Sequence, residues 1–204
     1  MTNDKTFDSS TWDDRYAAAA SSDSTVWSLT PNAWIAETID RLALQPGTAI
    51  DLGSGEGRNA LWLAQRGWQV TAVDFSAVAL RTGETRAEQL GVEVRWERAD
   101  VTTWVSPVLV DLVVIAYLQL EASDLADVIT AAAGSLEPGG HLVLIGHDLD
   151  NLERGVGGPQ EPAVLHTVAA LRAAAGDLTI ELCDQVLRPV GDAHAIDAVL
   201  IARR

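Results

Sequence analysis

A short apolar strand, a glycine-rich turn and a helix are predicted in direct succession over residues 48–66, and the strand that follows ends at Asp74. The turn contains Gly53, Gly55 and Gly57. Glycine adopts positive φ without strain and leaves the backbone bare, so a ligand can lie against the free amide groups at the start of the helix. This unit predicts a nucleotide-shaped site in an α/β fold.

The acidic residue before the turn indicates which nucleotide suits the site. Asp51 lies two residues before Gly53, near the carboxyl end of the predicted strand, so we expect its charge beside the ligand. That charge would repel a pyrophosphate, whereas it would attract the ammonium and sulfonium groups of S-adenosylmethionine (SAM). In addition, the third glycine follows the second by two residues, not the three of a dinucleotide motif. The sequence therefore favours SAM over NAD or FAD as the cofactor.

Composition limits the partners of the chain. Its 204 residues suit a single domain, and 14 basic against 29 acidic side chains give a formal net charge of −15. We therefore expect no nucleic-acid partner, since a polyanion would be repelled at long range. The acceptor is expected to be a small molecule, and the oligomeric state is left open between monomer and homodimer.

The N-terminal sequence and the cysteine content predict where the protein is located. The N-terminal residues Met-Thr-Asn-Asp-Lys-Thr have no apolar region that would direct export, and no apolar stretch is long enough for a membrane span. The only cysteine, Cys183, cannot form an internal disulfide and is expected to pack as a small apolar group. We expect a cytoplasmic protein with no membrane partner. We also expect no metal site, because no set of side chains has the sequence spacing that is typical of metal ligands.

Strands and helices alternate along most of the chain, which predicts a doubly wound, mostly parallel α/β sheet. Residues 1–30 are interpreted as an N-terminal arm with one short helix, and residues 31–204 as the main domain. The segment 147–162 is rich in glycine, proline and charge, which is typical of a lid loop. A helix is expected to start at Thr30 and Pro31. The other expected helices span 58–66, 76–90, 123–136 and 163–175; the expected strands span 48–52, 69–73, 92–97, 109–116 and 141–146, and a closing antiparallel hairpin is formed by 177–187 and 195–202.

Polar residues follow the predicted strands at the edge of the sheet where ligands bind in doubly wound folds. Asp51 is expected to face the ammonium of the methionine part, and Asp74 to accept hydrogen bonds from the ribose hydroxyls. Phe75 could lie against the adenine, and Asp100 could accept from its amine with Val101 beside it. The alternative is that such aspartates only cap the next helix or turn.

Four segments carry a family resemblance, which extends over about residues 31 to 146. These segments are Ala-Ile-Asp-Leu-Gly-Ser-Gly-Glu-Gly-Arg-Asn (49–59), Val-Asp-Phe-Ser (73–76), Ala-Asp-Val (99–101) and Leu-Glu-Pro-Gly-Gly (136–140). They resemble the successive motifs of class I SAM-dependent methyltransferases. The resemblance implies a Rossmann-like, seven-stranded sheet with a C-terminal antiparallel hairpin. The residues predicted to bind SAM in this main domain are Asp51, Gly53, Ser54, Gly55, Arg58, Asn59, Asp74, Phe75, Ser76, Asp100, Val101 and Ala116.

The N-terminal arm adds a looser resemblance. The run Trp-Asp-Asp-Arg-Tyr (12–16), together with Gly-Glu-Gly-Arg-Asn (55–59), is similar to small methyltransferases of the tellurite-resistance and thiopurine-methyltransferase type. This implies that Trp12, Arg15 and Tyr16 fold over the cofactor, with Arg15 as a partner for its carboxylate. The alternative is that the tryptophan and tyrosine simply pack on the sheet.

The leading hypothesis is methyl transfer from SAM to a heteroatom of a small-molecule acceptor. Tyr117 and His147 follow two of the predicted strands and are the candidate catalytic residues, with His147 able to accept a proton from the acceptor. Alternatively, His147 hydrogen-bonds a loop carbonyl and Tyr117 only lines the pocket. Two other functions stay open: a non-catalytic SAM-binding or regulatory module, and an NAD-dependent oxidoreductase.

Overall fold

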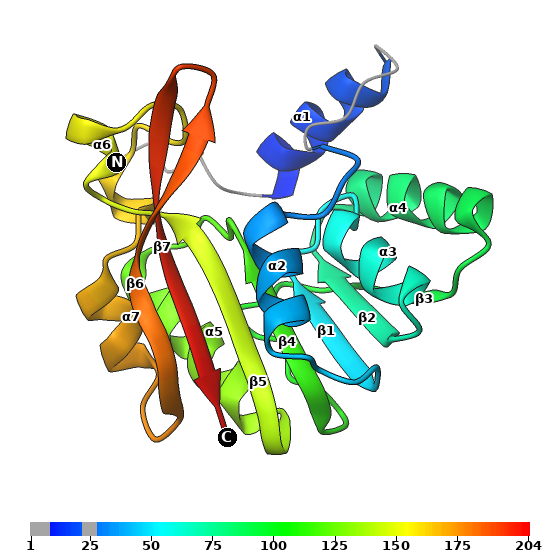
Figure 1. The fold of residues 1–204 in the computed structure, drawn as a ribbon. Coiled ribbons are helices and arrows are strands. Elements are labelled where there is room, and N and C mark those ends of the chain that lie inside the picture. The colour runs from blue at the N-terminus through cyan, green and yellow to red at the C-terminus, as the bar shows by residue number, and fades with distance from the viewer. Residues whose placement is uncertain (1–8, 22–27) are drawn as a thin grey trace. The chain divides into compact units, whose positions relative to one another are not determined.

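The computed structural model describes residues 9–21 and 28–204, and its strands form the predicted α/β sheet (Figure 1). The sheet has seven strands in the order β3-β2-β1-β4-β5-β7-β6. The fold class expected from the sequence is therefore confirmed. The chain divides into two compact units, Met1–Trp104 (unit 1) and Val105–Arg204 (unit 2).

Unit 1 contains three parallel strands and their helices. The helices are α1 (Ser9–Ser21), α2 (Ala33–Arg41), α3 (Arg58–Gln65) and α4 (Ala77–Leu90), and the strands are β1 (Thr48–Leu52), β2 (Gln69–Asp74) and β3 (Val94–Arg98). β2 pairs with both β1 and β3, with Leu52 beside Val73 and Asp74 beside Arg98. Because the strands are parallel, the glycine turn after β1 and the acid that ends β2 come to the same edge.

Local sequence signals fix the ends of α4, and a tryptophan fills the space beside it. The Ser76 hydroxyl accepts a hydrogen bond from the amide of Ala79, and Gly91 ends the helix in the left-handed conformation. The ring of Trp96 on β3 packs directly on Gly57 and Gly83, where an added Cβ would come within 2.3 and 2.4 Å of the ring. The glycine turn is thus supported from behind by an aromatic ring that tolerates no side chain at either position.

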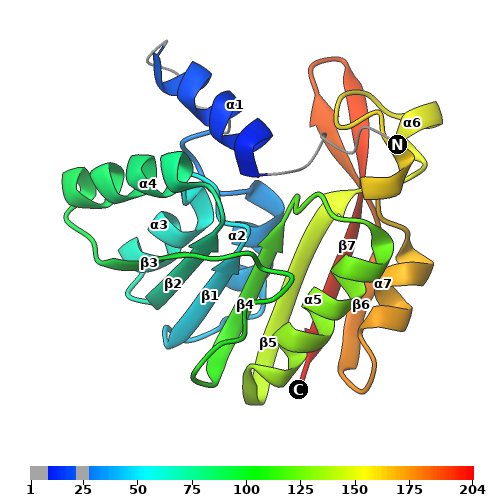
Figure 2. The ribbon, with the colours of Figure 1, turned by 180° about the vertical axis from the view of Figure 1, so that it is seen from behind.

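Unit 2 contains two parallel strands and an antiparallel hairpin. Its strands are β4 (Val110–Ala116), β5 (Leu136–His147), β6 (Thr179–Val190) and β7 (Ala193–Arg203), and its helices are α5 (Ala122–Gly134), α6 (Asn151–Arg154), the 3₁₀ turn η1 (Pro162–Val164) and α7 (Val168–Ala174). β4 and β5 are parallel, and β7 runs antiparallel to both β5 and β6. Helices α5 and α7 pack side by side over one face of these strands (Figure 2).

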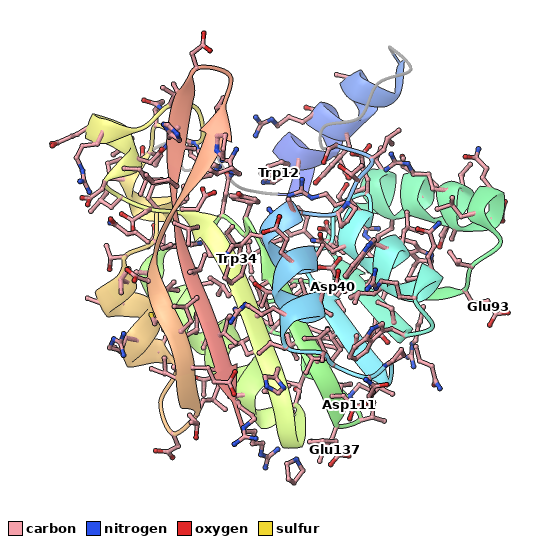
Figure 3. All side chains as sticks on the ribbon, viewed as in Figure 1. Trp12, Trp34, Asp40, Glu93, Asp111 and Glu137 are labelled. Atoms are coloured by element: carbon pink, nitrogen blue, oxygen red, sulfur yellow. The ribbon has the colours of Figure 1, made fainter. Side chains whose placement is uncertain are left out.

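The core of unit 2 explains why β4 and β5 read as continuous apolar runs in the sequence. Both faces of these strands are covered, so that Leu112, Ile115, Leu142 and Leu144 are inaccessible to solvent. The exposed polar side chains of β4 and β5 lie near the ends of the strands. Asp111 and Glu137 lie exposed at the amino ends of β4 and β5 (Figure 3), and the candidate residues Tyr117 and His147 lie at the carboxyl ends.

Several element ends differ from the sequence-based expectation. Helix α2 begins at Ala33, because the side chain of Asn32, not Thr30, accepts the capping hydrogen bond from the amide of Ile35. The predicted helix over 163–175 is split into η1 and the shorter α7, with Thr167 as the N-cap of α7.

The strands of unit 2 are also longer than expected. β5 begins at Leu136 and includes the Glu-Pro-Gly-Gly segment that was interpreted as a turn, with a bulge in its pairing between Val110 and Leu112. β6 continues through Pro189, which leaves only Gly191 and Asp192 in the hairpin turn.

The predicted arm over residues 1–30 is only partly described, because residues 1–8 and 22–27 lie outside the described residues. Within it, α1 is the expected short helix, and it packs against α4. The boundary between arm and main domain stays a prediction. No helix in the described ranges 9–21 and 28–204 is long and apolar enough to cross a membrane.

Candidate functional site

The glycine turn of unit 1 has the backbone conformation that its sequence predicts. Gly53, Gly55 and Gly57 have φ angles of 67°, 54° and 76°, in the left-handed region where a side chain would be strained. The amides of Gly53 and Ser54 both donate to the carbonyl of Val73, at 2.9 and 3.1 Å. The turn is therefore fastened to the end of β2 and does not depend on a ligand for its shape.

Asp74 connects this turn to the start of α4. Its Oδ2 accepts a hydrogen bond from the amide of Gly55 and its Oδ1 accepts one from the amide of Ser76, both at 2.8 Å. Burial raises the pKa of Asp74, although these two amide donors lower it in part. A carboxylate in this position keeps spare lone pairs, so it can also accept from the hydroxyls of a ligand.

Asp51 is the buried acid at the end of β1, with only 1% of its surface exposed. Its Oδ2 accepts a hydrogen bond from the amide of Ala60 at 3.0 Å, but its Oδ1 has no hydrogen-bond partner within the described part of the chain. Burial raises the pKa of Asp51 to about 7, and the neighbouring Asp74 adds to this effect. The hydroxyl of Ser54 is likewise buried without a partner among the described residues. The site thus contains unpaired acceptors that a ligand with donors or positive charge would satisfy.

The other residues predicted to bind the cofactor in unit 1 differ in how they are engaged. The side chain of Asn59 is buried and accepts from the amide of Asn32 at 2.9 Å, and Arg58 reaches the hydroxyl of Ser28 at 3.3 Å. Asp100 is exposed, and its Oδ1 accepts from both the amide and the hydroxyl of Thr102. Phe75 is half-buried, whereas Val101 is buried.

Helix α1 reaches this region through a residue to which the sequence analysis assigned no role. Asp13 hydrogen-bonds the hydroxyl of Ser76 and lies 3.4 Å from the amide of Val78, so it occupies the start of α4. The predicted arm residues contact one another. Trp12, visible on α1 in Figure 3, lies 5.8 Å from the ring of Tyr16 and 4.7 Å from the guanidinium of Arg15.

Unit 2 gathers a second cluster around Asp197, a residue on β7 that is completely buried. Its Oδ2 accepts hydrogen bonds from the hydroxyl of Tyr117 at 2.8 Å and from Nε of Arg188 at 2.7 Å. Its Oδ1 lies 3.2 Å from Nδ1 of His147. Burial alone would raise the pKa of Asp197, but its contacts with His147, Arg188 and Tyr117 outweigh that effect and lower it.

Tyr117, the first residue after β4, is held in an unusual conformation. It has a φ of 56°, which is uncommon for a residue with a side chain, and its amide donates to the carbonyl of Ile145 at 2.8 Å. Burial, and then the charge of Asp197, raises the pKa of the Tyr117 phenol. Ala116 lies just before it, half-buried at the end of β4.

His147 is enclosed by its neighbours in unit 2. Its ring centroid lies 4.7 Å from that of Tyr117, and an added Cβ on Gly158 would be 3.0 Å from its Nδ1. The backbone carbonyl of His147 accepts from the amide of His166 at 2.8 Å. Burial lowers the pKa of His166 to about 4, so that this second imidazole is neutral at pH 7. His166 itself packs on Gly146, where a Cβ would come within 2.0 Å of its ring.

The structure therefore brings the predicted residues together in two sets. Within unit 1 the turn residues and Asp51, Asn59, Asp74 and Ser76 form one connected group, and within unit 2 Tyr117 and His147 form another. Sequence reasoning missed Asp13, Arg188 and Asp197. Asp197 had a usable signal, because a lone acid in the apolar run Ala-Ile-Asp-Ala-Val-Leu-Ile (195–201) must find a partner when buried. The described residues contain no cluster of side chains that could hold a metal ion.

Comparisons with known proteins agree with this geometry. Residues 49–140 match the family model described as a methyltransferase domain. Over 97 residues the chain is 32% identical to a ubiquinone biosynthesis O-methyltransferase of Serratia proteamaculans. This alignment covers 47% of this chain and 40% of that protein. The chain spans about half the length, or less, of the curated relatives it matches.

Two solved structures have a similar fold. One is the N-methyltransferase NodS of Bradyrhizobium japonicum in complex with S-adenosylhomocysteine (SAH), with a TM-score of 0.71, 18% identity, and coverage of 95% of this chain and 98% of that chain. The other is TehB of Haemophilus influenzae, with a TM-score of 0.72, 16% identity, and coverage of 85% and 62%. At these identities, the likeness establishes the fold.

Proposed function

We propose that the chain is a class I SAM-dependent methyltransferase and that it transfers the methyl group of SAM to a heteroatom of a small-molecule acceptor. Unit 1 contains the residues proposed to bind the cofactor, and unit 2 contains Tyr117 and His147, the candidate residues for the acceptor. When bound, SAM supplies an activated methyl group on a positively charged sulfur, so the protein mainly has to align the acceptor and exclude water.

The observation that carries this proposal is the state of Asp51. A buried carboxyl with one unpaired oxygen, beside a second buried carboxyl at Asp74, is poorly stabilised in its charged form. A ligand with an ammonium and a sulfonium would supply the missing positive charge, whereas the pyrophosphate of NAD would add to the repulsion. The donor and acceptor pattern of the turn therefore suits SAM.

The remaining residues fit roles in the same site. Asp74 offers its spare lone pairs to the ribose hydroxyls, and the unpaired hydroxyl of Ser54 can bond the amino acid part of the cofactor. Phe75, Asp100 and Val101 follow β2 and β3 and would contact the adenine. Helix α1 is proposed as a lid over the cofactor, and the contact of Asp13 with the Ser76 hydroxyl holds it at the start of α4. The segment 147–162 of unit 2 is proposed as a second lid.

A small molecule suits this protein better than a nucleic acid as the acceptor. The formal net charge of −15 opposes the approach of any polyanion, and electrostatic attraction supplies much of the affinity of nucleic-acid-binding proteins. The chemistry of the acceptor-side cluster, a tyrosine, a histidine and an arginine–aspartate pair, is that of a compact polar site.

Isothermal titration calorimetry with SAM, SAH and NADH tests the cofactor assignment. We expect SAM and SAH to bind and NADH to give no heat; binding of NADH alone would contradict the proposal. Methyl transfer is then measured by mass spectrometry with a panel of small thiols, phenols and amines. Tight SAM binding without transfer to any of them would favour the non-catalytic SAM-binding alternative.

A further inference from the structure

The cluster around Asp197 brings a buried nitrogen of His147 against a buried carboxylate oxygen. Oδ2 of Asp197 is fully engaged, because it accepts from both Tyr117 and Arg188. Oδ1 of Asp197 and Nδ1 of His147 are both buried and lie 3.2 Å apart, and neither has a hydrogen-bond partner among the described residues. Each of these two atoms therefore depends on the other.

The position of the proton on His147 follows from this pairing. An ionised carboxylate has only acceptor capacity, so an unprotonated Nδ1 facing it would place two lone pairs against each other in a site closed to water. A proton on Nδ1 removes the repulsion and places a donor against the carboxylate, which makes the 3.2 Å contact attractive. In the neutral imidazole the other nitrogen, Nε2, is then the one that can accept a proton.

The same contacts remove Tyr117 from consideration as the base. Its hydroxyl proton is committed to Oδ2 of Asp197, and losing it would place a phenolate against a buried carboxylate. Arg188 provides the balancing charge, since its Nε donates to the same oxygen and its guanidinium lies 5.6 Å from the Tyr117 ring. The backbone of Tyr117 has a φ of 56°, a strained value for a residue with a side chain. We infer that the contact with Asp197 helps to maintain this conformation.

We propose that Asp197, held by Arg188 and Tyr117, fixes His147 as the Nδ1-protonated tautomer, so that Nε2 of His147 is the general base for an acceptor that must lose a proton. This inference rests on the proposed methyl transfer and narrows its acceptors to protic heteroatoms such as hydroxyls, thiols or amines. His147 is the catalytic residue, and Asp197, Arg188 and Tyr117 are positioning residues.

The proton and electron balance of the step is complete. The bond between the acceptor heteroatom and the methyl carbon forms while the carbon–sulfur bond breaks, and the sulfur keeps the bonding electron pair. The acceptor proton passes to Nε2 of His147, and solvent removes it before the next turnover. The other charged or titratable groups near the imidazole are Asp197 and Arg188 from the hairpin, Tyr117 after β4, and His166 before α7, which is neutral at pH 7.

The first test reads the tautomer directly and does not depend on activity. In long-range ¹H–¹⁵N NMR spectra of ¹⁵N-labelled protein at pH 8, the His147 signals are identified by their absence in His147→Gln. We expect Nδ1 to be protonated and Nε2 unprotonated. In Asp197→Asn, the amide oxygen must serve Tyr117 and Arg188, so its NH₂ group faces Nδ1 and the proton moves to Nε2. A wild-type His147 with its proton on Nε2 would overturn the proposal.

The second test separates base catalysis from structural support. Asp197→Asn is expected to slow methylation of a weakly acidic phenol by roughly 100-fold, in the range attributed to general bases. It should leave the rate with 4-nitrothiophenol, which is already ionised at pH 8, nearly unchanged. Equal slowing of both acceptors would contradict the inference. Asp184→Asn, an exposed substitution on β6, is the matched control and should alter neither rate.

Cofactor binding distinguishes failure of this inference from failure of the proposed function. Calorimetry should give the same SAH affinity for the wild type and for Asp197→Asn, because Asp197 is not one of the residues proposed to bind the cofactor. If the wild type does not bind SAH, the proposed methyl transfer fails, while the NMR result still decides whether Asp197 sets the tautomer.

Discussion

The glycine turn of unit 1 and the Asp197 cluster of unit 2 hold buried carboxyl groups in opposite electrostatic states. Burial disfavours the charged form in both places. The pKa of Asp51 is raised to about 7, because its few donors do not compensate for burial. The pKa of Asp197 is lowered, because His147, Arg188 and Tyr117 stabilise its charge despite burial. The charge of Arg58 near Asp51 does not offset burial, whereas Asp197 has a direct ion pair with Arg188.

This difference assigns the two regions different tasks. The site in unit 1 is incomplete without a positive ligand, so a cationic cofactor gains binding free energy there by satisfying Asp51. The cluster in unit 2 is neutralised by its own arginine, so it adds little attraction for charge and instead holds side chains in defined orientations. Substitutions in unit 1 should therefore change affinity, and those in unit 2 should change the rate.

The largest effect is expected from Asp74→Ala, which removes the acceptor for two backbone amides as well as the predicted ribose contact. We expect SAM affinity to fall roughly 100-fold, since a hydrogen bond to a charged group contributes about 1.5–3 kcal/mol. Calorimetry measures this affinity. Asp100→Ala is the comparison, because Asp100 is exposed and bonds only its own turn through Thr102. A loss at Asp100 as large as that at Asp74 would contradict the view that the affinity is concentrated in the buried acids.

The next largest effect is a pH dependence of SAM binding. Asp51 is mostly protonated below pH 7 in the free protein, and a cationic ligand favours its ionised form. Binding below pH 7 should therefore release a proton, and affinity should weaken by up to about tenfold for each pH unit below 7. Calorimetry between pH 5.5 and 8.5 in buffers of different ionisation enthalpy measures both quantities. Asp51→Asn should bind with little dependence on pH in this range; an unchanged pH dependence in this variant would assign the proton to another group.

The same group predicts the sign of a stability change. Because the pKa of Asp51 is higher in the folded than in the unfolded chain, the folded state binds more protons between pH 4 and pH 7. The contribution of Asp51 to the free energy of unfolding should thus fall as pH rises through this window, and Asp74, whose pKa is also raised, acts in the same direction. The lowered pKa of His166 acts in the opposite direction. The contribution of Asp51 is therefore measured as a difference: between pH 5 and pH 8, the thermal midpoint of the wild type should fall relative to that of Asp51→Asn.

The contrast between the units also explains what could be predicted from the sequence. The turn from Asp51 to Asn59 and the acid Asp74 belong to one strand–turn–helix–strand unit, so their positions follow from local rules on glycine and strand ends. The strands over 48–52 and 69–74 and the helix capped by Ser76 were predicted within one residue. The closing hairpin was predicted from its alternation and turn residues, although its strands extend further.

The Asp197 cluster could not be predicted in the same way. Tyr117, His147, Arg188 and Asp197 come from four strands or strand ends, and 80 positions separate the Tyr117 hydroxyl from its acceptor. Such a contact is set by the register of β7 against β5 and β6, which no local pattern determines. The prediction that Thr30 caps the helix was wrong for a related reason. The observed cap is Asn32, whose amide donates to Asn59, a residue 27 positions away in the sequence.

A smaller effect is expected from Gly83→Ala, which tests whether the packing of Trp96 supports the turn. The new Cβ would lie 2.4 Å from the Trp96 ring, which also packs on Gly57, so the ring must shift from its position against the glycine turn. We expect the free energy of unfolding to fall by about 1–3 kcal/mol, as for other overpacked sites, and SAM affinity to weaken with it.

Gly134→Ala in α5 is the control, because its Cβ would meet nothing within 4 Å and alanine favours a helix. Urea denaturation should show stabilisation for the control and destabilisation for Gly83→Ala; a stabilised Gly83→Ala would mean that the ring is not held there.

The smallest expected effect is a difference in kcat between alanine substitutions at two neighbouring glycines in the loop after β5. Gly157 and Gly158 have φ angles of 71° and 78°, so alanine costs similar backbone strain at either position. Only at Gly158 would the Cβ touch His147, at 3.0 Å from Nδ1, whereas at Gly157 it would meet nothing within 4 Å. If the orientation of this imidazole limits the rate, kcat should fall roughly threefold further in Gly158→Ala than in Gly157→Ala, a difference of about 0.7 kcal/mol in the activation free energy. SAH affinity should be the same in both variants, because the change is confined to unit 2. Equal kcat values would show that the enzyme tolerates a displaced His147, and the division between an affinity region and a rate region would then no longer hold at this residue.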